Sequence, residues 1–226
     1  MEIDDKILET IAINAANHAK GQVRIQKEAY VVQPKSYKQL TDASSKKTKE
    51  AHKSLYEGYA KKLTEVSSKI DSATDADTIR SLKIEESFLL NAVYLHELFF
   101  SNCFNSTSEL YQETLSFIRL QRDWGTFDKW MDEFQKCAAA SRNGWVVCAY
   151  NTYLKKLQNV CIDSHNVNVP LGTIPIIVID TWEHSYFADF GIDKEAYVVA
   201  MMREIDWDVV EERMSKIDQV NEVLTR

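Results

Sequence analysis

The sequence predicts an α+β protein in which a long N-terminal helical hairpin is followed by a small antiparallel three-stranded sheet flanked by helices. Apolar residues recur at helical spacing through most of residues 46–103. Three short runs in the second half are rich in β-branched and aromatic residues, and residues 174–179 (IPIIVI) are the clearest of them. A helical pattern returns after residue 181. Helices on both sides of a short run of strands are typical of an α+β arrangement.

In the first half of the chain the pattern predicts three helices. Residues 1–20 carry a short apolar stripe at helical spacing, whereas residues 22–44 lack either period and predict an extended arm. Two longer helices are expected over residues 46–70 and 78–103, separated by the polar segment DSATDAD.

The second half predicts two shorter helices within residues 105–136, broken near Trp124 and Gly125, and then strands and further helices. The strands are expected at residues 145–150, 157–162 and 174–179, and the last helices at residues 197–203 and 209–223.

The length of 226 residues fits one large domain or two small ones. From the pattern we expect an N-terminal extension (residues 1–44), a helical-hairpin domain (45–106) and an α/β C-terminal domain (107–226).

Composition excludes several classes of protein. The 34 acidic and 27 basic residues give a net charge of −7, which argues against a nucleic-acid binder. The apolar runs are too short to span a bilayer, and no secretory signal opens the sequence. None of the four cysteines forms a C-x-x-C pair, so we expect reduced thiols and a cytoplasmic protein. These are Cys103, Cys137, Cys148 and Cys161.

Three of the five histidines and one aspartate stand in positions that suggest a metal site. Asp180 and His184 follow the strand pattern IPIIVI directly, and His52 and His96 lie on the two long predicted helices. A lone histidine on an apolar helix is more often a hydrogen-bonded core residue. Three imidazoles with one carboxylate, however, form a suitable ligand set for iron or manganese. Zinc accepts the same ligand types, but it more often recruits cysteines or keeps three protein ligands.

Residues 180–187 (DTWEHSYF) resemble the signature D-x-W-E-H-[AS]-[YF] of the iron/manganese superoxide dismutase family. Further segments resemble that family in the same order, and together they cover residues 45–214, roughly three quarters of the chain. They are S-x-x-T-x3-H (45–52), NAVYLHELFFSN (91–102), WGTFDKWMDEF (124–134), NGWVV (143–147) and the tail YVVAMMREIDWDVVEERM (197–214).

The resemblance implies an antioxidant enzyme that converts superoxide to dioxygen and hydrogen peroxide at one iron or manganese ion per subunit. The implied ligands are His52, His96, Asp180 and His184. An alternative register would place Thr48 at the first ligand and His52 at the family's second histidine. We prefer His52 as the ligand because Ser45 and Thr48 then stand at their family offsets.

The resemblance also assigns roles around the ligands. Tyr59 stands one residue short of the family's gateway tyrosine, which guards entry and relays a proton, and Tyr56 takes the place of the second histidine. Trp145 and Trp182 would form the apolar wall that keeps water out.

The sequence departs from the family at the glutamine that usually hydrogen-bonds the solvent at the metal. One of its two usual positions is Ala92, and the other falls in the loop containing His165. Since some relatives use a histidine in this loop, His165 is our candidate donor, although it could also be an exposed loop residue. Phe187 replaces a frequent tyrosine.

The sequence also leads to expectations about the protein's assembly and about the charges near the first ligand. In the family the residue matching Glu183 reaches across a dimer interface to the partner's metal-ligand histidine, so a homodimer or a dimer of dimers is expected. Superoxide is an anion and the protein is acidic, so lysines near the first ligand either focus the substrate or form a solvated helix face. They are Lys46, Lys47, Lys49 and Lys53.

Two other functions stay open at this point. The chain could be a structural or interaction protein that retains the fold with reduced or no activity, which the missing glutamine and Phe187 favour. A different redox or hydrolytic activity at the same metal is a weaker third option.

Overall fold

The computed structural model of the protein describes residues 43–103 and 108–224, all within the unit formed by residues 32–226. The helix expected over residues 1–20 and most of the arm after it lie outside the described residues. The expected division at residues 44/45 and 106/107 stays a prediction. The expected fold class is confirmed.

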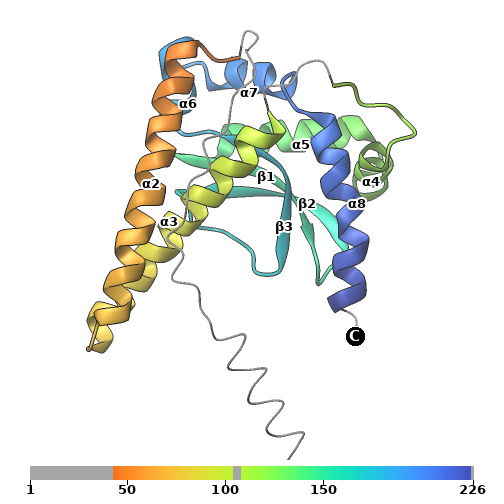
Figure 1. Cartoon of the computed structure of the whole chain (residues 1–226). Coiled ribbons are helices and arrows are strands. Elements are labelled where there is room, and N and C mark those ends of the chain that lie inside the picture. The colour runs from red at the N-terminus through yellow and green to blue at the C-terminus, as the bar shows by residue number, and fades with distance from the viewer. Residues whose placement is uncertain (1–42, 104–107, 225–226) are drawn as a thin grey trace, which may run out of the picture. The chain divides into compact units, whose positions relative to one another are not determined.

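A pair of long antiparallel helices, α2 (Lys46–Ser72) and α3 (Ala76–Asn102), forms the hairpin (Figure 1). Each helix begins at a side-chain cap, because Ser45 Oγ accepts from Thr48 N and Asp75 Oδ1 accepts from Thr78 N. The buried positions of α2 recur every three or four residues and form one stripe that faces α3. They are Thr48, His52, Tyr56, Ala60, Leu63 and Val66.

The sheet contains β1 (Gly144–Asn151), β2 (Lys156–Asp163) and β3 (Thr173–Asp180) in the antiparallel order β2-β1-β3. All three strands match the expected runs. β1 is buried along its whole length, and Trp145 pairs with Asp180 at the end of β3. Gly144 is required at the start of β1, since a Cβ there would lie 1.8 Å from the carbonyl oxygen of Ile162.

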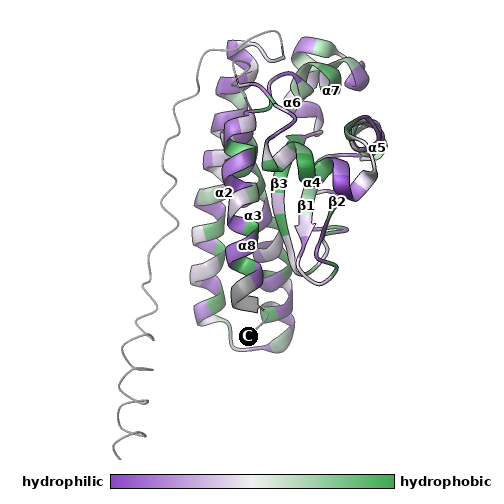
Figure 2. Ribbon diagram, turned by 90° about the vertical axis from the view of Figure 1, so that its right-hand side faces the viewer, coloured by the Kyte–Doolittle hydropathy of each residue, from purple (hydrophilic) through white to green (hydrophobic). Residues whose placement is uncertain are grey.

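Among the described residues five shorter helices follow the hairpin, of which α4, α5 and α8 pack against the sheet, and strands β1 and β3 are largely hydrophobic (Figure 2). Helix α3 packs against β3, whereas α5 packs against β1 and β2. The helices are α4 (Leu115–Trp124), α5 (Phe127–Ala140), α6 (Glu183–Phe190), α7 (Lys194–Met202) and α8 (Trp207–Leu224).

The helix boundaries follow caps that the apolar pattern does not reveal. The expected break near Trp124 and Gly125 is confirmed, with Gly125 at a φ of 83°. Helix α7 begins earlier than expected because Asp193 Oδ1 accepts from Ala196 N at 2.9 Å.

A buried asparagine joins α3 to β3. Asn102 is 0% exposed. Its amide donates to Val178 O at 3.1 Å and its Oδ1 accepts from Val178 N at 2.9 Å, as a neighbouring strand would. Arg213 on α8 donates to the same Oδ1 at 3.0 Å. These bonds set the end of α3, which carries His96, against the end of β3, which carries Asp180.

Between residues 43 and 224, leaving aside 104–107, no helix combines the length and apolar character needed to cross a membrane.

Candidate metal centre

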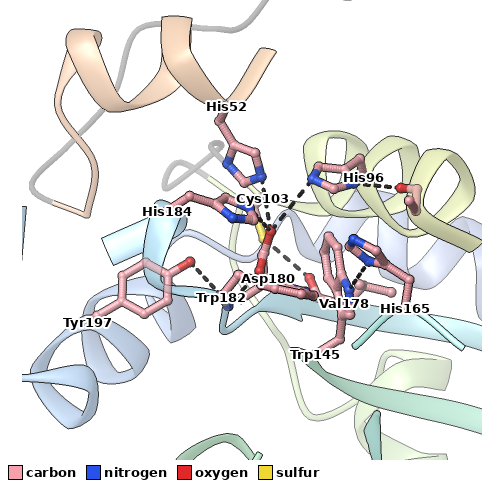
Figure 3. A network of polar contacts seen from close by, with 11 residues as sticks. His52, His96, Cys103, Trp145, His165, Val178, Asp180, Trp182, His184 and Tyr197 are labelled. Atoms are coloured by element: carbon pink, nitrogen blue, oxygen red, sulfur yellow. Dashed lines mark hydrogen bonds and ion pairs between the residues drawn. The ribbon is translucent and has the colours of Figure 1, made fainter. Parts of the chain in front are cut away.

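Four side chains from four elements converge at one point (Figure 3). His52 comes from α2, His96 from α3, Asp180 from the end of β3 and His184 from the first turn of α6. One ligand atom from each lies within 4.8 Å of all the others. The structure therefore brings together the four residues that the sequence suggested as ligands.

One carboxylate oxygen is the focus of the cluster. Asp180 Oδ2 lies 3.0 Å from His52 Nε2, 3.1 Å from His184 Nε2 and 3.8 Å from His96 Nε2. The ring of His52 is 4.9 Å from the rings of both other histidines, centroid to centroid. His52 therefore points toward His184, as expected if His52 rather than Thr48 belongs to the cluster.

Hydrogen bonds outside the cluster decide which atoms face it. His96 Nδ1 donates to Ala92 O at 2.5 Å, and since a carbonyl only accepts, its Nε2 is left with a lone pair. Asp180 Oδ1 accepts from Trp182 N at 2.8 Å, which leaves Oδ2 for the cluster. The Tyr197 hydroxyl donates to Asp180 O at 2.8 Å and holds the backbone there. Such outer contacts are typical of metal ligands.

The protonation states suit a metal ion. Burial lowers the pKa of His52, and it lowers that of His96 well below its usual value. Burial alone would raise the pKa of Asp180, but His184 and His52 outweigh it and hold that pKa well below its usual range. Neutral imidazoles beside an ionised carboxylate are the states in which these groups bind a metal.

Two nitrogen atoms of the cluster lack the well-aligned hydrogen bond that buried polar atoms normally make. Nε2 of His52 and Nε2 of His96 are buried without a hydrogen bond among the described residues, although both face Asp180. A buried polar atom without a partner is costly. The donor set therefore fits a cation at its centre.

His165 is buried next to the cluster and is not an exposed loop residue. Trp145 Nε1 donates to His165 Nδ1 at 2.9 Å, so the proton of the neutral ring is on Nε2. That Nε2 is buried and has no hydrogen-bond partner in the part of the chain described. Burial lowers the pKa of His165 to about 4, which keeps the ring neutral at pH 7.

Aromatic side chains surround His165. Its ring stacks on that of Trp182 with the ring centroids 5.0 Å apart. The centroids of the Phe88 and Tyr59 rings are 4.6 Å and 5.1 Å from that of His165. The Tyr59 ring is also 5.5 Å from that of His96, and burial together with Asp180 raises the pKa of Tyr59. Tyr59 thus lies beside the cluster despite its shifted sequence position.

Tyr56 is a buried residue of α2 whose hydroxyl hydrogen-bonds Glu97 on α3. Its side chain is 2% exposed, and the hydroxyl donates to Glu97 Oε1 at 2.7 Å. Its ring is 6.2 Å from that of His96. Tyr56 therefore packs beside a ligand and links α2 to α3.

Three residues that were expected to contribute to the site, Glu183, Lys46 and Lys53, are at least partly exposed. Glu183 is exposed, beside His184, whose side chain is 27% exposed. On their own helix, Lys46 Nζ is 3.8 Å from Glu50 Oε1 and Lys53 Nζ is 3.9 Å from Glu57 Oε1. Such ion pairs one turn apart are typical of a solvated helix face.

Phe88, Tyr197 and Asn102 also shape the centre, although the sequence did not mark them as site residues. Phe88 belongs to the apolar stripe of α3, and Tyr197 lies 17 positions from the carbonyl it holds. Asn102 follows the apolar residues Leu98, Phe99 and Phe100 by two positions at the end of the predicted helix, and nothing in the sequence distinguishes it from Ser101.

The chain is similar to known proteins over most of its length. Residues 113–213 match the family model described as iron/manganese superoxide dismutases, C-terminal domain. The chain is 32% identical over 205 residues to "Superoxide dismutase [Fe]" of Aquifex aeolicus, covering 85% of this chain and 95% of the relative. It is 34% identical over 184 residues to the protein of the same name from Aquifex pyrophilus, covering 77% and 84%. A "Superoxide dismutase [Mn]" from Haloarcula marismortui is 36% identical over 124 residues, covering 54% and 60%.

Proposed function

The chain belongs to the iron/manganese superoxide dismutase family, and we propose that it converts superoxide to dioxygen and hydrogen peroxide at its four-residue cluster. The observation that carries the proposal is the convergence of two buried imidazole Nε2 atoms, neither with a well-aligned hydrogen bond among the described residues, on one ionised carboxylate oxygen, 3.0 Å from His52 and 3.8 Å from His96. When bound, an iron or manganese ion supplies the one-electron exchange that oxidises one superoxide and reduces the next.

The ion would be held by His52 and His96 from the two long helices and by Asp180 and His184 from the end of β3 and the start of α6. Imidazoles are neutral when they bind a metal, so the Asp180 carboxylate would be the single negative charge of the ligand set, and the bound cation would keep a net positive charge that attracts an anionic substrate. Trp182 N and the Tyr197 hydroxyl fix the carboxylate and its backbone, so Oδ2 is presented without rearrangement.

His165 is the residue that we propose as the proton-holding donor in place of the family's glutamine. Trp145 occupies its Nδ1, and the proton on Nε2 is buried next to the ligands. Reduction of superoxide to hydrogen peroxide consumes protons, and a fixed N–H can hydrogen-bond the oxygen that receives them.

Tyr59 is the second residue that we propose as a proton donor. Its ring is close to His96 and His165, and its raised pKa keeps the hydroxyl protonated at neutral pH. Trp145, Trp182 and Phe88 form apolar walls on the same side, and they would limit the entry of water.

We further propose that the chain works as a homodimer, or as a dimer of dimers, in the cytoplasm. His184 is partly exposed and Glu183 is next to it on the surface, so a second copy placed there would cover the ligand and could accept its ring N–H. All four cysteines are free, which fits a reducing compartment. Size measurement of wild type and Glu183→Ala tests the assembly, since loss of this contact should shift the protein toward monomer.

A direct experiment tests the function. The full-length protein is purified, its iron and manganese are quantified, and superoxide loss is measured with and without azide. The expected result is about one ion per chain with activity that azide inhibits and that His96→Ala loses together with its metal. Stoichiometric metal without dismutation would reject the enzyme and support a protein that only retains the fold. Metal-free protein loaded with each ion separately then decides between iron and manganese.

A matched pair of variants tests His165. His165→Gln keeps an N–H donor, whereas His165→Ala removes it from the same position. We expect the alanine variant to lose activity about 10–100-fold with its metal retained, and the glutamine variant to keep much more of it. Equal activity in both variants would contradict the role of His165.

A further inference from the structure

Two cysteines meet between α5 and β2, away from the ligand cluster. Cys137 lies near the end of α5 and Cys161 lies on β2. The Cys161 thiol donates to the backbone oxygen of Cys137 at 3.4 Å, which places the Cys161 sulfur beside Cys137. Both are free in the structure.

The pair differs from the other two cysteines in access to solvent. Cys137 and Cys161 are partly exposed, whereas Cys103 and Cys148 are buried at 4% and 0% exposure. A small oxidant in solution can therefore reach this pair and not the others. The buried thiols give the experiment an internal control.

The surroundings of the two sulfur atoms are unequal. Burial, the neighbouring thiol and Glu133 raise the pKa of Cys137 to about 12, which makes Cys137 the poorer first nucleophile.

We propose that Cys137 and Cys161 form a peroxide-oxidised dithiol site, in which Cys161 attacks first and Cys137 closes the disulfide. The Cys161 thiolate attacks one oxygen of hydrogen peroxide, so an S–O bond forms, the O–O bond breaks and the departing hydroxide takes a proton to become water. Cys137 sulfur then attacks Cys161 sulfur, an S–S bond forms, the S–O bond breaks and a second water leaves. In sum, two thiols and one hydrogen peroxide give one disulfide and two waters.

The oxidant is the product of the proposed reaction, so the site would respond to the enzyme's own turnover. The test does not depend on that turnover, because hydrogen peroxide is added directly. Failure of the disulfide and failure of dismutation are therefore separate results.

The full-length protein is treated with excess hydrogen peroxide, remaining thiols are blocked under denaturing conditions, and non-reduced peptides are analysed by mass spectrometry. We expect one linked peptide pair that joins Cys137 to Cys161 and has lost two hydrogens. Cys103 and Cys148 should remain fully alkylated. A reducing agent should restore both thiols.

Single variants test the order of attack with a sulfenic-acid trap such as dimedone. Cys137→Ser should accumulate trapped adduct at Cys161, whereas Cys161→Ser should carry at least about tenfold less at Cys137. The site is rejected if the folded wild-type protein keeps both thiols or links any other pair. Equal trapping in the two variants would overturn the order of attack. If a variant does not fold, the wild-type linkage result decides.

Discussion

The two sides of the ligand cluster are built differently. On the strand side, formed by Asp180 on β3 and His184 on α6, the chain itself satisfies the polar groups around the carboxylate: Trp182 N donates to Oδ1 and the Tyr197 hydroxyl donates to the backbone oxygen. On the helix side, formed by His52 on α2 and His96 on α3, each imidazole has a buried Nε2 that makes no well-aligned hydrogen bond among the described residues, although these atoms lie 3.0 Å and 3.8 Å from Asp180 Oδ2.

This difference indicates that the strand side is preorganised, whereas the helix side is completed by a bound ion. A buried polar atom that makes no well-aligned hydrogen bond costs up to about 1–3 kcal/mol. Binding of both Nε2 atoms by one cation removes that cost and ties α2 and α3 to the end of β3. The predictions below test this asymmetry in order of decreasing effect.

Asp180→Asn should have the largest effect, because it removes the single negative charge from the cluster and replaces Oδ2 by a group that binds cations poorly. We expect metal affinity and dismutase activity to fall by more than about 100-fold. Metal content after dialysis and specific activity are the measurements. Asp132→Asn, an exposed carboxylate on α5 paired with Lys136, is the matched control and should change neither. A variant that kept its metal would show that the carboxylate is not the centre of the site.

Removal of the metal should loosen the helix side more than the strand side. At a free metal concentration a thousandfold above Kd, the loaded protein should be about 4 kcal/mol more stable to unfolding than the metal-free protein. Amide hydrogen exchange of the two forms locates the change. We expect exchange to accelerate most around His52 on α2 and His96 on α3, with a smaller change at the end of β3. Equal acceleration in the helices and in β3 would contradict the asymmetry.

Asn102→Ala should weaken the packing of α3 on β3, because it removes the hydrogen bonds between Asn102 and Val178. The change leaves Val178 N and Val178 O without their side-chain partner and takes one acceptor from Arg213. We expect a loss of about 3 kcal/mol in the free energy of unfolding, measured by urea denaturation of metal-free protein. Asn91→Ala, at a less buried position on the same helix, is the control. If both variants lost the same stability, the bonds to β3 would contribute nothing specific.

Much of this architecture could be predicted from the sequence because its signals are local. The long helices follow from apolar spacing, and the strands follow from short β-branched runs that end in turns. The strand side was the most predictable part of the site, since Asp180, Trp182 and His184 lie within one short segment. Local spacing also placed His52 and His96 on their helices, although not their distance from each other.

The remaining features depend on contacts between distant segments. Asn102 and Val178 are 76 positions apart, and their pairing exists only once α3 is packed on β3. The state of His165 depends on Trp145, because the indole N–H determines which ring nitrogen carries the proton. Spacing alone also suggested that Tyr59 was displaced by one residue, yet its ring reaches both His96 and His165.

Glu211→Gln should have the smallest effect and should leave both sides of the cluster unchanged, because Glu211 lies on α8 and caps the start of α4. Its carboxylate accepts from Leu115 N at 2.8 Å and from Ser116 N at 2.7 Å. Partial burial alone would raise the pKa of Glu211, but the bonds from Ser116 and Leu115 outweigh it and lower that pKa in the folded state. The ionised form therefore stabilises the fold at pH values above the unfolded-state pKa, and this contribution is lost as the pH falls through the lower folded-state pKa.

We expect Glu211→Gln to lower the free energy of unfolding by about 0.5–1 kcal/mol at neutral pH, with the difference from wild type shrinking in acid. Urea denaturation of metal-free protein at a series of pH values measures this, and Glu212→Gln, whose carboxylate pairs with Lys216 on the surface, is the matched control with no measurable change. A Glu211→Gln deficit that stayed constant from neutral to acid pH would show that packing, and not the charge at the helix start, is what the side chain contributes.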